Sequence, residues 1–263
     1  MPLEVATEPT ASASPPTSAS AGGPAVAGYR AEVRAPSLRP GATAEVELRL
    51  FDPQGKQLTE TDFRIAHERR IHLLIIDESL SDYHHEHPVP KKDGKVLTFK
   101  LTPRKAGPYR VFVDVLPEAT RRHLYLVADL AGTGAGGPIE GRELVTSAQV
   151  DGYSFELMLP AVVKEGTTLN GELAIKDRDG KVVTQLEPVM GAYAHLVGFF
   201  EDRKTVEHMH PMGAEPTAPS DRGVGKLRFR VTPTKSGLMK LFAQVKLDGK
   251  ERFAPFTLNI APK

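Results

Sequence analysis

The chain has 263 residues, of which 34 are Lys or Arg and 33 are Asp or Glu. This balance, without a basic block, argues against a nucleic-acid-binding protein. The absence of Cys excludes disulfides and thiolate metal sites, and no apolar run approaches the roughly 18–20 residues of a transmembrane helix. The length suits one large domain or two domains of about 100–150 residues each.

Residues 1–28 consist mainly of Ala, Ser, Thr, Pro and Gly and contain no aromatic residue. Such a segment buries too little apolar surface to offset its ordering entropy, so we predict a disordered tether. The first residues lack the basic start and apolar core of a signal peptide. We therefore expect either a cytoplasmic protein or one whose signal was removed. Tethers of this composition often follow an export signal or a lipid anchor. This favours a periplasmic, cell-envelope or secreted location with membrane tethering, and a tail without a role is the alternative.

From Tyr29 onward, short runs with alternating apolar residues follow one another. The run at 43–51 places three aliphatic side chains on one face, which is typical of a half-buried strand. The run at 70–77 is apolar on both faces and indicates a central strand. The other strands predicted in this half lie at 29–35, 83–87, 95–101, 109–115 and 123–130. No long segment has the helical period, and short strands separated by turn signals indicate an all-β sandwich.

The pattern restarts after a Gly-rich linker at residues 131–142. FDPQGKQLT in the first half matches KDRDGKVVT in the second, and FKLTPRKAGPYRVFVDV matches FRVTPTKSGLMKLFAQV. These matches indicate an internal duplication. We therefore predict an all-β chain of two tandem Ig-like (immunoglobulin-like) antiparallel β-sandwich domains, at residues 29–130 and 143–263.

One repeated stretch combines apolar residues with histidines. HLLIIDESLSDYHHEHP at residues 72–88 recurs as HLVGFFEDRKTVEHMHP at residues 195–211. Each copy begins with His in an apolar run and ends in His-x-His-Pro, with the same spacing between the histidines. Both copies are compatible with a β-hairpin.

The hairpin geometry predicts that three histidines meet in each copy. Residues i and i+2 of a strand share a face, so His85 and His87 project together. A two-residue loop at Glu78 and Ser79 pairs His72 with His85, and a shift of one residue in the turn pairs it with His87. Cross-strand neighbours are about 4.5–5.5 Å apart at Cβ, so the three imidazoles can converge on one metal ion in either register. The same reasoning groups His195, His208 and His210.

Three neutral imidazoles suit a borderline divalent ion such as Cu(II), Zn(II) or Ni(II). We expect copper, with zinc as the alternative, and no catalytic residue. Met212 is an even number of residues from His208 and His210, so a continuous strand would place all three side chains on one face. Its thioether is therefore a further candidate ligand, which would favour Cu(I). The first domain has Val89 at that position, so the two sites need not be identical.

Two other interpretations remain open. In the first, the histidines hydrogen-bond within their hairpins and the protein is an adhesion or scaffold module. In the second, the protein is a cupin-like metal-dependent enzyme, because cupins carry His-x-His on strands and Glu215 lies five residues after His210. Cupin sites also need a His from a later strand, and the second domain has none. His84 aligns with Glu207 and is expected at the surface, whereas His67 and His123 have no counterpart and are expected to be incidental.

The repeated segments also resemble a known group of proteins. HLLIIDESLSDYHHEHP and LEPVMGAYAHLVGFFEDRKTVEHMHP, each followed by a TP-x-K-x-G turn and a strand, are similar to bacterial envelope proteins with Ig-like sandwich domains. Their genes often lie near heavy-metal or copper handling functions. The resemblance covers residues 29–263. It implies an exported protein whose partner is a metal ion or another envelope protein. One departure is Tyr109, a candidate tyrosine-corner residue, which is Met239 in the second copy.

Overall fold

The computed structural model describes residues 19–22, 26–66 and 68–263. Within this part of the chain the only helical element is a single 3-10 turn, η1 (Glu60–Asp62), and the other elements are strands. The strands form four antiparallel sheets, two in each half of the chain. The predicted all-β tandem sandwich is therefore confirmed. Among the described residues, no helix has the length and apolar character that a bilayer crossing requires.

Domain 1 contains two sheets. The first has the spatial order β1 (Ala19–Gly22), β2 (Arg30–Ala35), β3 (Ala44–Phe51), β8 (Leu97–Leu101) and β7 (Val89–Pro90), with β4 (Gln57–Leu58) paired to β3. The second has the order β10 (Leu124–Leu130), β9 (Tyr109–Val115), β5 (Ile71–Asp77) and β6 (Tyr83–Glu86). Each run predicted as a strand in this half contains an observed strand.

The pairing of β1 with β2 corrects part of the predicted tether. Ala19 pairs with Ala35, and the ladder continues to Gly22. Residues 19–22 thus complete the edge of the first sheet, because the backbone groups of β2 accept a further strand. Residues 1–18 and 23–25 of the predicted tether lie outside the described residues.

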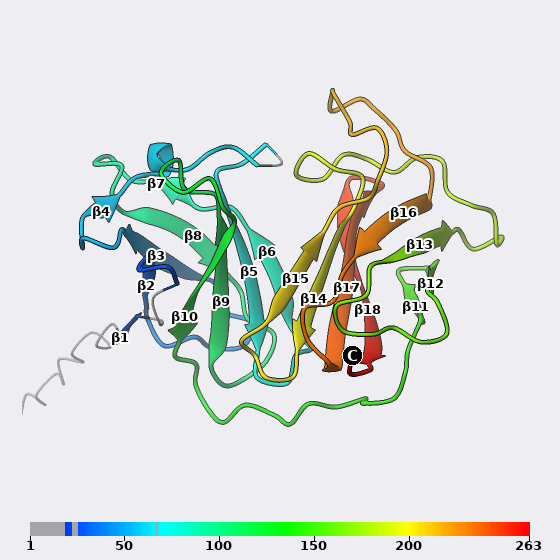
Figure 1. Cartoon of the computed structure of the whole chain (residues 1–263), viewed down its shortest axis with the longest axis horizontal. Helices are drawn as coiled ribbons and strands as arrows, with labels where there is room; N and C mark the ends of the chain where they lie inside the picture. The colour runs from blue at the N-terminus through cyan, green and yellow to red at the C-terminus, as the bar shows by residue number, and fades with distance from the viewer. Residues whose placement is uncertain (1–18, 23–25, 67) are drawn as a thin grey trace, which may run out of the picture.

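Domain 2 repeats this arrangement. The third sheet has the order β11 (Ser147–Val150), β12 (Tyr153–Met158), β13 (Leu169–Lys176) and β16 (Lys226–Val231). The fourth has the order β15 (Val206–Met209), β14 (His195–Phe200), β17 (Gly237–Leu247) and β18 (Lys250–Ile260). The chain between β10 and β11 contains no strand and runs along the lower side of both domains (Figure 1).

Strand β5 is buried along its whole length because its two faces pack into different cores. Leu73 and Ile75 belong to the core inside domain 1. Leu74 and Ile76 point the other way, into a cluster that both domains build. The predicted burial of both faces is confirmed, and the second face is covered by the other domain.

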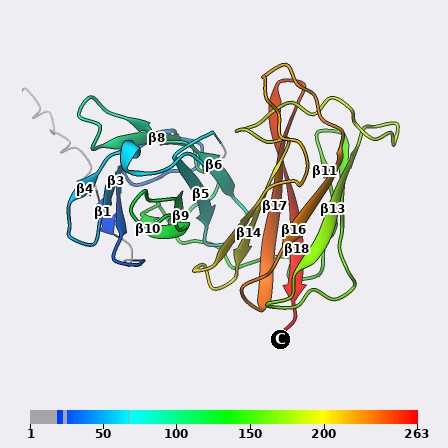
Figure 2. The ribbon, with the colours of Figure 1, turned by 45° about the horizontal axis from the view of Figure 1, so that its top comes forward.

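The second and fourth sheets pack against each other through this interdomain core. Its buried members are Leu74, Ile76, Leu80, Tyr83, Phe112 and Val127 of domain 1, with Val197, Phe199, Val206 and Phe242 of domain 2. The Tyr83 ring lies 5.3 Å from that of Phe199 and 5.2 Å from that of Phe242. Both views show β14 and β15 beside β5 and β6 (Figures 1 and 2). Burial of these rings stabilises the contact, at roughly 1.5–3 kcal/mol for each large apolar side chain.

We expect a double-mutant cycle to detect this contact between the domains. Tyr83→Ala and Phe199→Ala should each destabilise the protein, and their effects should deviate from additivity by about 0.5–1.5 kcal/mol, the coupling typical of a buried aromatic pair. Urea denaturation of the wild type, the two single variants and the double variant measures the coupling. Phe155 is as buried as Phe199 but belongs to the inner core of domain 2, so Phe155→Ala is the matched control. A Tyr83 and Phe199 pair that is additive within about 0.3–0.5 kcal/mol would contradict the shared core.

Candidate metal centre

The hairpin of β5 and β6 determines which residues of domain 1 meet. Leu74 pairs with His85 and Leu73 with Glu86, so the next pair in the same register is His72 with His87. This is the second of the two predicted registers. The prediction of a two-residue loop was wrong, because the five residues 78–82 connect the strands. The side chain of Asp77 closes this longer turn by accepting hydrogen bonds from backbone N–H groups within it.

The three histidines of each domain form a compact triad. In triad 1 (His72, His85 and His87) and triad 2 (His195, His208 and His210), one ring nitrogen from each residue lies within 4.8 Å of the other two. In triad 1, Nδ1 of His72 is 3.3 Å from Nε2 of His85 and 3.0 Å from Nε2 of His87. In triad 2, Nε2 of His208 is 3.2 Å from Nδ1 of His195 and 3.3 Å from Nε2 of His210. Each triad can therefore hold a metal ion through three nitrogen ligands.

Backbone carbonyls set the tautomer of the first histidine in each triad. Nε2 of His72 lies 2.9 Å from the carbonyl oxygen of Ala66, and Nε2 of His195 lies 2.9 Å from that of Val189. A carbonyl only accepts, so each Nε2 carries the proton and donates it. The lone pair of each Nδ1 then faces its triad, as is usual for metal-binding histidines.

The second histidine of each triad is oriented by the opposite domain. Nδ1 of His85 lies 2.9 Å from Oε1 of Gln244, and Nδ1 of His208 lies 3.0 Å from Oδ2 of Asp114. In both cases Nδ1 donates, which leaves Nε2 with its lone pair directed to the triad. Asp114 and Gln244 occupy equivalent positions in the repeated strands β9 and β17. The amide of Gln244 is oriented by a further hydrogen bond from Nε2 to Glu251, at 2.8 Å.

Burial keeps His85 and His87 neutral, whereas hydrogen bonds keep Asp114 charged. Burial lowers the pKa of His85 well below its usual range, and His195 and His208 lower it further. Burial and the nearby His72 lower the pKa of His87 to about 3. Burial alone would raise the pKa of Asp114, but hydrogen bonds from His123 and His208 hold it below its usual range. At neutral pH the imidazoles of His85 and His87 thus have lone pairs for a metal, beside a buried carboxylate.

The two triads lie next to each other across the domain interface. The ring centres of His85 and His195 are 5.0 Å apart, and those of His85 and His208 are 5.5 Å apart. The ring centres of His72 and His208 are 5.7 Å apart. All six histidines therefore form one continuous cluster between the second and fourth sheets.

Several sequence predictions around the triads need correction. The parity argument for Met212 is wrong because β15 ends at Met209 and the side chain of Met212 is 47% exposed. Glu215, which the cupin-like interpretation used, is exposed in the same loop. His123 is not incidental, because its Nδ1 lies 3.2 Å from Oδ1 of Asp114. His67 lies outside the described residues.

Asp114 and Gln244 were missed by the sequence analysis. The available signal was a polar residue at the same position of two otherwise apolar repeated strands, VFVDV and LFAQV. A period of two places these residues on one face with Phe112 and Phe242. Their partners, however, come from the other domain, and no spacing within one repeat points to them.

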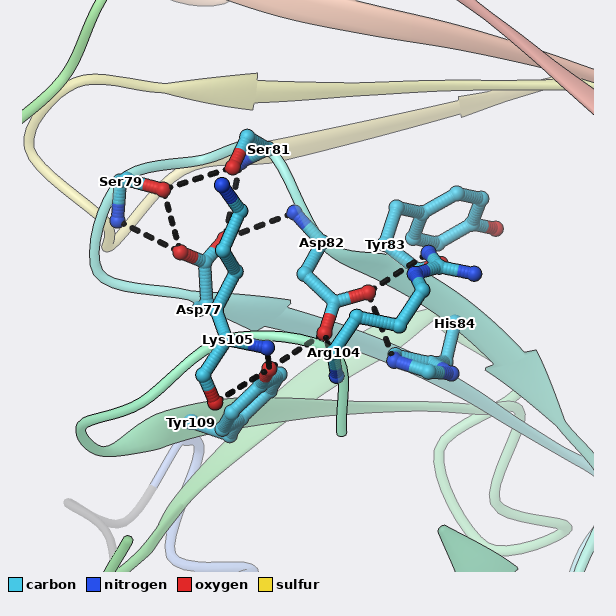
Figure 3. Close-up of polar contacts among 9 residues, drawn as sticks. All are labelled: Asp77, Ser79, Ser81, Asp82, Tyr83, His84, Arg104, Lys105 and Tyr109. Atoms are coloured by element: carbon cyan, nitrogen blue, oxygen red, sulfur yellow. Dashed lines mark hydrogen bonds and ion pairs between the residues drawn. The ribbon is translucent and has the colours of Figure 1, made fainter. Parts of the chain in front are cut away.

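A buried carboxylate also anchors the β6 strand that carries His85 (Figure 3). Asp82 is 1% exposed and accepts hydrogen bonds from the hydroxyl of Tyr109 and, at 2.6 Å, from the amide of Arg104. Nε2 of His84 and the guanidinium of Arg104 lie 2.9 and 2.6 Å from its other oxygen. The prediction that His84 is a surface residue is therefore wrong. Burial would raise the pKa of Asp82, but these partners, His84 first, lower it to about 2.

Comparisons with known proteins identify a matching family and several solved structures with distant similarity. The family described as a domain of unknown function (DUF8832) matches residues 24–131 and 148–262, one stretch in each domain. No curated protein matches the chain.

Three solved structures illustrate the likenesses. The first is a mutant of Salmonella alpha-2-macroglobulin (11% identity, TM-score 0.25, covering 88% of this chain and 16% of that one). The second is Escherichia coli alpha-2-macroglobulin activated by porcine elastase (14% identity, TM-score 0.23, covering 86% of this chain and 21% of that one). The third is domains 4 and 5 of the S-layer protein SbsC (14% identity, TM-score 0.23, covering 88% of this chain and 97% of that one). The chain thus spans only 16% and 21% of the two macroglobulins, and similarity at this level implies nothing about what it binds.

The Asp82 network predicts a specific loss of stability in acid. The pKa of Asp82 is about 2 in the folded protein against an ordinary 3.8, so its contribution is present above about pH 4 and is lost as the pH falls towards 2. Asp82→Asn should lower the free energy of unfolding by about 2 kcal/mol at pH 7, and the difference from wild type should shrink between about pH 4 and pH 2. Denaturant titrations across this range measure it, with Asp179→Asn in an exposed turn as the control. A difference that is constant with pH would contradict the assignment.

Proposed function

We propose that this chain, which belongs to the DUF8832 family of domains of unknown function, is a non-catalytic protein that binds copper at its two histidine triads. The observation that carries the proposal is the convergence of three ring nitrogens in each triad within 4.8 Å. Hydrogen bonds to the outer nitrogens of the first two histidines of each triad direct the inner lone pairs to one point. Such outer hydrogen bonds are typical of metal-binding imidazoles.

The chemistry of the ligands favours copper among the divalent metals. Each triad offers three imidazoles and no thiolate or carboxylate, a donor set that suits Cu(II), Zn(II) and Ni(II) and is poor for Mg²⁺ or Ca²⁺. For one nitrogen site, affinity increases along the first-row series to Cu(II) and falls again at Zn(II). Zinc is therefore the second candidate.

An envelope location completes the proposal. It is supported by the Ala-, Ser- and Pro-rich composition of residues 1–28 and by the resemblance to exported bacterial proteins. Fractionation of cells that carry the gene tests it. Recovery of the protein with cytoplasmic markers would overturn this part of the proposal.

Calorimetric titration with Cu(II) should show two ions bound per chain, with dissociation constants of about 1 μM or lower. His85→Ala combined with His208→Ala should abolish binding at both triads, because each change removes one of the three ligands of its triad. His84→Ala is the matched control, since it removes a histidine from the same strand whose imidazole contacts Asp82 instead.

Two outcomes would contradict copper binding. One is wild-type protein that binds neither Cu(II) nor Zn(II) in this range. The other is a double variant that binds like wild type. In that case the cross-domain hydrogen bonds of His85 and His208 would support the scaffold interpretation, in which these substitutions lower only stability, by about 1–3 kcal/mol.

Copper should also stabilise the fold, because a triad assembled from distant residues exists only in the folded chain. At a free Cu(II) concentration about 100 times the dissociation constant, each site should add about 2.7 kcal/mol to the free energy of unfolding. For a chain of this length the melting temperature should rise by roughly 5–10 °C for each site. Differential scanning calorimetry with copper, and again after a chelator is added, measures the shift. An unchanged melting temperature in saturating copper would contradict the prediction.

A further inference from the structure

The geometry points to a single two-metal centre that the two domains share, and we propose this arrangement in place of two independent sites. This inference rests on the proposed metal binding and extends it to how the two ions are held. Three observations carry it: the distance between the triads, the hydrogen bonds that cross the interface, and the packed core beside them.

The first observation is proximity. An ion lies about 2 Å from a ligating nitrogen and so about 3 Å from the centre of that ring. Two ions on rings whose centres are 5.0 Å apart are therefore at most about 11 Å from each other. The rings of His85, His195 and His208 are close enough to be in contact, so no layer of protein separates the two ions.

The second observation is the exchange of supporting residues between domains. Gln244 of domain 2 orients His85 of triad 1, and Asp114 of domain 1 orients His208 of triad 2. The two contacts repeat each other, as expected for two duplicated domains that pack through equivalent faces. Neither triad has its complete set of hydrogen bonds without the other domain.

The third observation is rigidity. The interdomain core lies on the same sheet faces as the histidines and next to them. The ring of Tyr83, for example, lies 6.3 Å from that of His85. Glu78 and Arg203 form an ion pair of 2.9 Å across the interface. Packing of this kind fixes the separation of the two triads, so the distance between two bound ions is a property of the fold.

The centre is also asymmetric. Asp114 is a carboxylate whose other oxygen contacts His123, whereas its equivalent, Gln244, is a neutral amide. A carboxylate that accepts a hydrogen bond from a ligating imidazole makes that imidazole a stronger ligand. Triad 2 therefore fills before triad 1.

Electron paramagnetic resonance of Cu(II) tests the two-metal centre. Wild-type protein loaded with two Cu(II) ions, counted by native mass spectrometry, should give a broadened spectrum with a half-field transition from coupled ions. His195→Ala/His210→Ala retains triad 1, and His72→Ala/His87→Ala retains triad 2. Both variants keep the histidines that bond across the interface, and each should bind one ion and give an uncoupled spectrum.

The outcomes separate this inference from the proposed function. Two bound ions whose spectrum equals that of an equal mixture of the two variants would overturn the shared centre and leave copper binding intact. One ion held jointly by both triads would also overturn it. Wild type that binds no copper would overturn both proposals.

A crossed pair of substitutions tests the supporting residues. In the variant that retains triad 1, Gln244→Leu should weaken Cu(II) binding about 10–100-fold, although Gln244 belongs to the other domain. In the variant that retains triad 2, the same change should have no effect, and Asp114→Asn should show the reverse pattern. Gln244→Glu keeps the acceptor and should preserve the affinity of triad 1, which distinguishes a positioning role from general loss of structure. Equal effects on both triads would overturn the crossed arrangement.

Discussion

The packing of the second sheet against the fourth is the contact on which the rest of the structure depends. Strands β5 and β14 are buried on both faces because each sheet serves two cores, one inside its domain and one between the domains. Aliphatic and aromatic residues form one part of this shared interface, and the six histidines form another beside them together with Asp114 and Gln244. The same burial that joins the domains keeps His85 and His87 neutral.

Six histidines that are buried or half-buried at one interface are costly unless they find partners. The structure supplies these partners in an ordered way: carbonyls of Ala66 and Val189 for the first histidine of each triad, and Gln244 and Asp114 for the second. The inner nitrogens are left facing one another at 3.0–3.3 Å. An arrangement that satisfies the outer nitrogens and gathers the inner ones is what a metal ion needs, whereas hairpin stabilisation alone does not require three rings to converge.

The errors of sequence reasoning have two causes. Met212 was placed by extending the parity of β15 past Met209, where the strand ends. His84 and His123 were judged by the absence of a repeated counterpart, yet both contact buried carboxylates, Asp82 and Asp114. A comparison of the two repeats identifies what the domains have in common, so it cannot identify residues that support only one of them.

The sequence by itself determined the duplication, the all-β class, the strands and the membership of each triad. These follow from local patterns, because side chains alternate with a period of two and both registers that the hairpin spacing allowed bring the same three histidines together. Only the tertiary structure decided that the two triads meet, and that Gln244 and Asp114 each orient a histidine of the other domain. Those partners are 159 and 94 residues away along the chain. Their contact depends on how two finished sheets dock, which is set by the summed shape of their apolar faces and not by spacing within either repeat.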